Sequence, residues 1–173
     1  DTYGITLAGL LLERLHERPF AELLEQRLFA PLGMKSTSLE SSGAALARGY
    51  GLSGDSHVLQ PYEWYVTLPA SSVDSTVTDM ARLMLALLGD GSLDGTAATR
   101  ILAPATLARI HAAQYRDHPA VPGFTHGFWE LERYGPEHPA LQHGGTMRGY
   151  SCDLTLFPRD RLGVFVACNR DGE

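Results

Sequence analysis

Residues 143–150 read His-Gly-Gly-Thr-Met-Arg-Gly-Tyr, and two apolar runs follow them at 151–158 and 162–168. The turn residues Pro158-Arg159-Asp160-Arg161 lie between the runs, so we expect an antiparallel hairpin with strands at 150–157 and 163–169. Glycines beside a strand leave room for another backbone or a ligand. A histidine there can donate, accept or carry a proton near neutral pH. The stretch therefore predicts a sheet with a candidate site at its entrance.

Upstream of this stretch the pattern is mainly helical. Apolar residues recur at helical spacing in 3–17 and 20–29, and the second run stops at Pro31-Leu32-Gly33-Met34. Further predicted elements are a helix capped by Thr76 and running to Leu88, a short helix over 104–113 and a strand over 124–134. Helices precede strands without β-α-β alternation. We therefore predict one α+β domain over 1–173, an antiparallel sheet packed with helices.

Composition excludes several classes of function. The 173 residues carry a formal net charge of −6, and no basic stripe is present, which argues against nucleic-acid binding. No apolar run approaches the roughly 20 residues of a membrane span. The first residue is Asp1 rather than Met, which suggests a fragment or a processed product and leaves the cellular compartment open.

The two cysteines, Cys152 and Cys168, fall in the two strands of the predicted hairpin. We expect a register that pairs Cys152 with Cys168, so that the numbers of paired residues sum to 320. In this register Leu154, Val164 and both cysteines lie on one apolar face. The β-carbons of opposed residues are farther apart than in most disulfides. We therefore predict two reduced, buried thiols.

The order of several segments resembles the serine β-lactamase and penicillin-binding-protein superfamily, in its class C-like and esterase-like branch. The matching segments are Tyr3-Gly4, Phe29-Ala30-Pro31-Leu32-Gly33-Met34-Lys35-Ser36-Thr37, Ala47-Arg48-Gly49-Tyr50, Pro69-Ala70, Ser75-Thr76-Val77-Thr78-Asp79-Met80-Ala81-Arg82 and His143-Gly144-Gly145. In that superfamily a His-x-Gly often replaces Lys-Thr-Gly in the third motif. The resemblance implies a partial β-lactamase/transpeptidase-like fold. It also implies a periplasmic or secreted location.

The nucleophile motifs of that superfamily are missing from this chain. Ser-x-x-Lys cannot occur, because the single lysine, Lys35, has Leu32 three positions before it. Tyr-x-Asn cannot occur either, because the single asparagine, Asn169, has Ala167 two positions before it. Ser71 and Ser72 stand where the family commonly has glycine. The chain thus resembles the second part of a hydrolase that has lost, or was cut from, its nucleophile half.

The candidate site residues follow from the third motif. His143 is the candidate catalytic residue, as a proton donor or hydrogen-bond donor to a bound carbonyl or carboxylate; the alternative is a structural histidine at a strand end. Gly144, Gly145 and Thr146 are candidate substrate-binding residues, the glycines because they admit a substrate backbone; their alternative is a tight turn. Arg148 is a candidate clamp for a carboxylate, or a solvated loop arginine.

Other site chemistry is weakly supported by the sequence. Ser71, Ser72 and Ser75 lack a lysine three positions later, so none is favoured as a nucleophile. The histidines are scattered and have no cysteine partners, so we expect no metal site and no cofactor. The five histidines considered are His111, His118, His126, His138 and His143.

The resemblance implies acyl transfer to water by a serine hydrolase acting on a β-lactam, a D-alanyl peptide or an ester. Without its nucleophile this chain alone is expected to be inactive. The alternative is a non-catalytic binding or structural domain that kept the fold. A small-molecule or peptide substrate is the expected ligand of the parent protein. The apolar helix 3–17 and the sheet faces predict a homo-oligomer.

Overall fold

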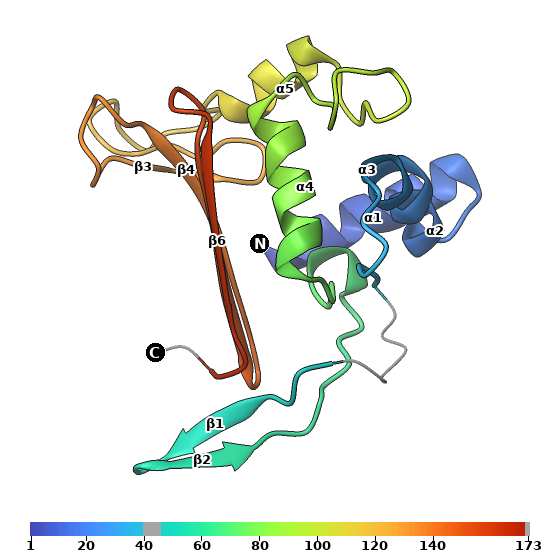
Figure 1. Ribbon diagram of the computed structural model, residues 1–173, viewed down its shortest axis with the longest axis vertical. Helices are drawn as coiled ribbons and strands as arrows, with labels where there is room; N and C mark the ends of the chain where they lie inside the picture. Colours follow the sequence, from blue (N-terminus) through green and yellow to red (C-terminus); the bar gives the residue numbers. More distant parts are fainter. Residues whose placement is uncertain (40–45, 172–173) are drawn as a thin grey trace.

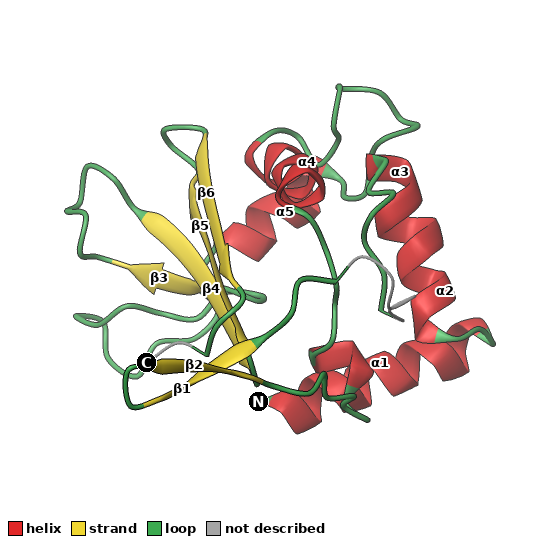
Figure 2. Cartoon of the chain, turned by 60° about the horizontal axis from the view of Figure 1, so that its bottom comes forward, coloured by secondary structure: helices red, strands yellow, loops and turns green. Residues whose placement is uncertain are grey.

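The computed structural model describes residues 1–39 and 46–171 and has an α+β architecture with antiparallel sheets. The larger sheet has the strand order β3-β4-β5-β6. Helix α4 lies between this sheet and the N-terminal helices, and the small β1–β2 hairpin lies at one end of the sheet (Figures 1 and 2). The main elements are α1 Thr2–His16, α2 Phe20–Leu24, η1 Glu25–Phe29, α3 Ala30–Leu32, β1 Tyr50–Ser53, β2 Ser56–Leu59, η2 Leu68–Ala70, α4 Val77–Leu88, α5 Pro104–His111, β3 Trp129–Leu131, β4 Ala140–Met147, β5 Tyr150–Phe157 and β6 Leu162–Cys168.

The glycine-rich motif forms a strand itself. β4 pairs with β5 from Leu141↔Leu156 to Met147↔Tyr150, and only Arg148 and Gly149 connect the two strands. The predicted hairpin of β5 and β6 is confirmed within one residue at each end. The strand predicted over 124–134 is wrong in length, because β3 covers only Trp129–Leu131. Gly127 and Gly135, with φ of 100° and 80°, flank this strand and break the extended conformation there.

Helix α4 separates two hydrophobic cores. Its Met84 and Leu87 pack with Leu154 and Leu156 of the sheet. Its Ala86 is fully buried on the opposite side and packs with residues of the preceding helical segment, including Phe29 and Leu32. Thr76 caps the helix as predicted, since its Oγ1 accepts a hydrogen bond of 3.2 Å from the Asp79 N–H. One capped helix thus holds the helical layer against the sheet.

The predicted helix over 20–29 continues to Leu32 as α2, a π-helical turn and α3. Pro31 lies inside this last turn, and the residue that ends it is Gly33, with φ of 64°. The Pro-Leu-Gly-Met segment then docks on the start of α4. Asp79 is buried and accepts hydrogen bonds from the Ser36 N–H at 2.8 Å and from the Thr37 hydroxyl at 2.9 Å. This buried carboxylate joins the N-terminal helices to α4.

The predicted register of the cysteine hairpin is wrong by one residue. The structure pairs Cys152 with Ala167 and Ser151 with Cys168, so paired numbers sum to 319. Gly163 and Phe165, rather than the valines, face α4, because Gly163 leaves space for Met84 and Phe165 packs on the core. The two cysteines therefore lie on opposite faces of the sheet. Both are free, as predicted, but they are exposed rather than buried.

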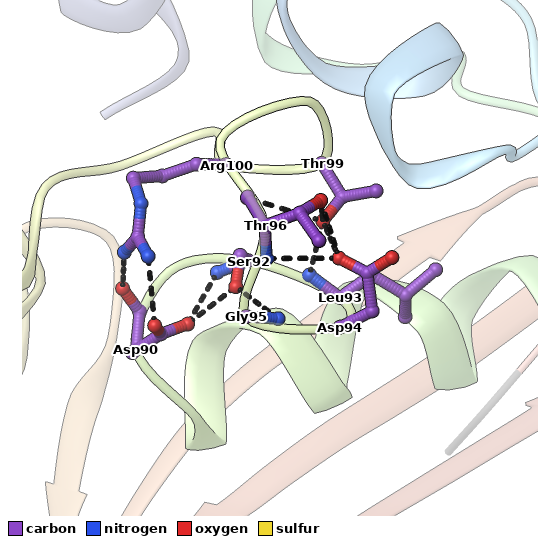
Figure 3. Close-up of polar contacts among 8 residues, drawn as sticks. All are labelled: Asp90, Ser92, Leu93, Asp94, Gly95, Thr96, Thr99 and Arg100. Atoms are coloured by element: carbon purple, nitrogen blue, oxygen red, sulfur yellow. Dashed lines mark hydrogen bonds and ion pairs between the residues drawn. The ribbon is translucent and has the colours of Figure 1, made fainter.

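The loop after α4 is fixed by its own side chains (Figure 3). Asp90 forms an ion pair of 2.8 Å with Arg100 across the loop. Hydrogen bonds from Ser92 and Arg100 lower the pKa of Asp90 to about 2. Asp94 organises the opposite part of the loop by accepting from Thr96 and Thr99. Hydrogen bonds within the loop and the ion pair of Arg100 with Asp90 thus order the loop.

Ser72 adopts the backbone conformation for which the resemblance led us to expect glycine. Its φ is 66°, and the residue is 3% exposed. Its hydroxyl is buried without a hydrogen-bond partner. Both features carry a free-energy cost, because side chains rarely adopt this φ and a buried hydroxyl loses its water.

Candidate functional site

The glycine-rich half of β4 has a strand on only one side. β3 pairs with β4 at Ala140–Gln142 and ends there, whereas β5 runs beside β4 as far as Met147. Among the described residues, no strand pairs with 143–147 on the side of β3. Residues 143–146 are exposed. An open strand edge of this kind offers backbone N–H and C=O groups to an extended ligand.

His143 begins this open segment. It stands opposite Leu154, and opposed residues of an antiparallel pair share a face. Since Leu154 packs in the core beside α4, His143 lies on the same face of the sheet as α4, but is itself exposed. Its imidazole is exposed and can exchange a proton with a ligand at the edge.

The two glycines keep the segment free of side chains. A β-carbon at Gly144 would lie 3.6 Å from the Asp153 carboxylate, an ordinary contact. A β-carbon at Gly145 would lie 3.3 Å from the sulfur of Cys152, which is tight. The fold itself therefore tolerates alanine at Gly144. The absence of a side chain there matters for whatever approaches the strand from outside.

A contact between two glycine backbones supports the turn after β4. Gly149 has φ of 81°, and a β-carbon on it would lie 2.8 Å from the Cα of Gly49. A β-carbon on Gly49 would in turn lie 2.9 Å from the Gly149 carbonyl oxygen. The Tyr150 hydroxyl donates 2.7 Å to the Ala47 carbonyl beside this crossing. The β1–β2 hairpin is thus fixed directly against the turn that follows the candidate site.

The guanidinium of Arg148, in this turn, already forms hydrogen bonds within the protein. Its Nε donates to Gln60 Oε1 at 2.7 Å, and its Nη1 donates to Glu63 Oε1 at 2.8 Å. The Tyr65 hydroxyl donates to Glu63 Oε2 at 2.9 Å. The pKa of Glu63 is lowered, first by the hydrogen bond from Arg148 and then by that from Tyr65. Arg148 therefore presents a guanidinium whose charge is compensated within the protein.

Sequence reasoning missed the partners of Arg148. Gln60 and Glu63 lie 88 and 85 residues from it along the chain. Nothing in the local pattern links the two segments. Next to them, burial and Asp74 raise the pKa of Tyr62 to about 12, so that phenol stays protonated. Its ring packs edge-on against both Trp64 and Tyr150. The segment 60–65 is thereby held beside the turn of the candidate site.

The hydroxyls of the three serines considered as nucleophiles are either hydrogen-bonded within the fold or buried in it. Ser71 donates to the Thr67 carbonyl at 2.9 Å, and Ser75 shares a hydrogen bond of 2.8 Å with Thr37. The hydroxyl of Ser72 is the buried, unpartnered one. Within the described residues none of them forms a hydrogen bond with a lysine or histidine that could activate it.

A separate hollow of about 560 Å³ lies at the opposite end of β4, beside Ala140 and Leu141. Two of its arginines have partners within the protein: Arg116 pairs with Glu130, and Arg159 donates to the Pro136 carbonyl. In the described ranges we find neither a helix suited to crossing a bilayer nor a group of three or more potential metal ligands.

The comparisons with known proteins agree with the fold. The family model for the Beta-lactamase domain matches residues 1–173. A human protein, putative beta-lactamase-like 1, is 29% identical over 166 residues, which are 92% of this chain and 31% of that protein. An octameric penicillin-binding protein homologue from Pyrococcus abyssi superposes with a TM-score of 0.81 at 19% identity, over 97% of this chain and 37% of that one. A class C beta-lactamase from Rhodobacter sphaeroides gives 0.78 at 19% identity, over 100% and 55%.

The fold is that of β-lactamases and penicillin-binding protein homologues. The chain belongs to the Beta-lactamase family. It spans about a third of the human relative and about half of the Rhodobacter enzyme.

Proposed function

We propose that this chain forms one wall of the active site of a serine hydrolase, which transfers an acyl group from an ester or amide to water. The observation that carries the proposal is the open edge of β4 at 143–147, with a histidine at its start and two glycines beside it. Family membership supports the same reaction class. The nucleophilic serine would come from polypeptide outside these 173 residues.

Each residue of the strand has a role in this proposal. His143 holds or delivers a proton at the reacting carbonyl or leaving group. Gly144 and Gly145 let the substrate backbone come within hydrogen-bonding distance of β4. Thr146 and Arg148 contact the substrate farther along the edge. β-Lactams, D-alanyl peptides and simple esters are the substrate classes to be compared.

The test compares this chain with the longer gene product that contains it. We expect saturable hydrolysis of a chromogenic β-lactam or a nitrophenyl ester by the longer protein and none by the 173-residue chain. His143→Ala in the longer protein should lower kcat/KM by about a hundredfold or more, because it removes a proton-transfer group. Saturable turnover that survives this substitution would place the site elsewhere.

Gly144→Ala is the matched variant, because its methyl group has room in the fold. We expect normal thermal unfolding and a raised KM. The rival hypothesis, a non-catalytic domain that kept the fold, predicts no turnover by any form of the protein. An initiator methionine at or near Asp1 in the gene would favour that rival, whereas Ser-x-x-Lys followed by Tyr-x-Asn upstream would favour the enzyme.

We also propose that the chain self-associates through apolar surface. Helix α1 exposes seven large apolar residues: Tyr3, Ile5, Leu7, Leu10, Leu11, Leu12 and Leu15. Exposed apolar patches of this kind usually bind a partner. The Pyrococcus homologue is an octamer, which supports assembly in a structural relative.

A further inference from the structure

Arg148 follows the open segment of β4 directly, as the first residue of the turn. In this position its guanidinium could bind the carboxylate of a substrate that lies along the strand edge. Free carboxylates are carried by D-alanyl peptides and by β-lactams, but not by simple esters. Whether the positive charge of Arg148 is free or compensated therefore affects which of these substrates the site binds.

That charge is already compensated by Glu63. Oε1 of Glu63 accepts from Arg148 at 2.8 Å, and its other oxygen is held by the Tyr65 hydroxyl at 2.9 Å. Gln60 occupies the Nε of the same guanidinium at 2.7 Å. The pair is on the surface, with 51% of the Arg148 and 37% of the Glu63 side chain exposed, so an incoming ligand meets both groups.

A substrate carboxylate at this position would lie beside the Glu63 carboxylate and would repel it. It would have to displace Glu63 from Arg148 before forming an ion pair of its own. A neutral ester or amide carbonyl does not meet this repulsion and can accept from the remaining N–H groups of Arg148. The contacts thus separate the substrate classes by charge.

We propose that Glu63 is a specificity-determining residue, which makes this site prefer acyl compounds without a carboxylate next to the scissile bond. The favoured ligands are neutral esters and amides. The proposal rests on the function proposed for the β4 edge, because it assumes that acyl ligands bind there. Arg148 then binds a neutral carbonyl of the substrate rather than a carboxylate.

The test uses two thioesters that differ only in one charge: benzoylglycyl mercaptoacetate and its methyl ester. Their dissociation constants are measured by NMR titration of the 173-residue chain, with the Gly144 and Gly145 amide signals reporting binding at β4. We expect the methyl ester to bind about tenfold more tightly, a ratio typical of one nearby like charge at a protein surface. Glu63→Gln should raise the affinity for the free acid about tenfold and leave that for the methyl ester unchanged.

Two variants control this result. Glu132→Gln removes the same charge from the opposite end of the sheet and should leave the ratio unchanged. In the double variant Glu63→Gln with Arg148→Gln, the affinity for the free acid should return to that of the unaltered chain. Because exposed ion pairs contribute little to stability, all variants should fold, which thermal unfolding checks.

The outcomes separate this proposal from the function on which it rests. An unchanged ratio in Glu63→Gln, an equal change in Glu132→Gln, or no shift of the glycine signals with either thioester would each overturn the specificity role. If the ratio responds as expected but the longer protein hydrolyses neither compound, the specificity role stands and the hydrolase proposal fails.

Discussion

At the scale of single residues, Ser72 combines two unfavourable features, a φ of 66° and a buried hydroxyl without a partner. Glycine removes both. We expect Ser72→Gly to raise the free energy of unfolding by about 1 kcal/mol, after the entropy that glycine loses on folding. Chemical denaturation measures this change. Ser72→Ala keeps the strained backbone and should gain less; an equal gain would assign the cost to the hydroxyl alone.

The thiol of Cys152 gives a pH-dependent prediction. Although the residue as a whole is exposed, partial desolvation of the sulfur raises the pKa of this thiol, and the nearby Asp153 acts in the same direction. Only the thiolate is alkylated, so the rate at neutral pH falls when the pKa is raised. In a Cys168→Ser variant we expect iodoacetamide to react with a midpoint above the usual thiol pKa of about 8.5. A midpoint at or below that value would contradict the desolvation of the sulfur.

The sequence predicted the candidate residues, but neither the strand that they form nor the residues that modify it. His143, Gly144 and Gly145 are contiguous, and their chemistry is readable from one short motif. The contact between Arg148 and Glu63 depends on how two loops 85 residues apart are folded together. The faces of β6 were assigned wrongly because valines suit a core as well as Phe165 does. The space that Gly163 leaves for Met84 becomes visible only once α4 is in place.

At the scale of elements, Asp79 joins the segment after α3 to the start of α4. Asp79→Ala removes the acceptor of the partly buried Ser36 N–H and of the buried Thr37 hydroxyl. We expect a loss of roughly 2–4 kcal/mol in the free energy of unfolding, measured by denaturant titration.

Asp79→Asn keeps one acceptor oxygen and should lose less. The exposed Asp55, in the turn between β1 and β2, provides the control, since alanine there should change stability by less than about 0.5 kcal/mol. Equal losses at Asp55 and Asp79 would mean that the buried carboxylate does not join the two layers.

The helices were the most predictable elements, because apolar spacing and capping residues act locally. Thr76 and Gly33 mark a helix start and a helix end where sequence signals placed them. Strand β3 was less predictable, because its three residues are extended by pairing with Ala140–Gln142 and by a bridge from Trp129 to Phe124, both of which depend on the fold. The open edge of β4 is a consequence of that short strand, and the sequence of β4 alone does not reveal it.

At the scale of the whole molecule, α1 is apolar on more faces than the fold covers. Leu7 and Leu11 are 52% and 57% exposed and lie one turn apart. We expect the apparent mass in light scattering to rise with concentration above the 18.8 kDa of one chain. Replacing both leucines with lysine should abolish the rise.

Leu52→Lys is the control for this association, because Leu52 is equally exposed, at 51%, but lies on β1. It should associate like the unaltered chain. A single mass of 18.8 kDa at high protein concentration would contradict self-association altogether.

The crossing of Gly49 and Gly149 has a use beyond stability. The two backbones touch with no side chain between them. We therefore expect a shift of the Arg148 turn to reach the β1–β2 hairpin without a flexible intermediate. The tip of that hairpin, at Asp55, is exposed and distant from the strand edge in sequence. A fluorophore attached there would act as an optical reporter of occupancy at β4, and would allow compound libraries to be screened without any turnover.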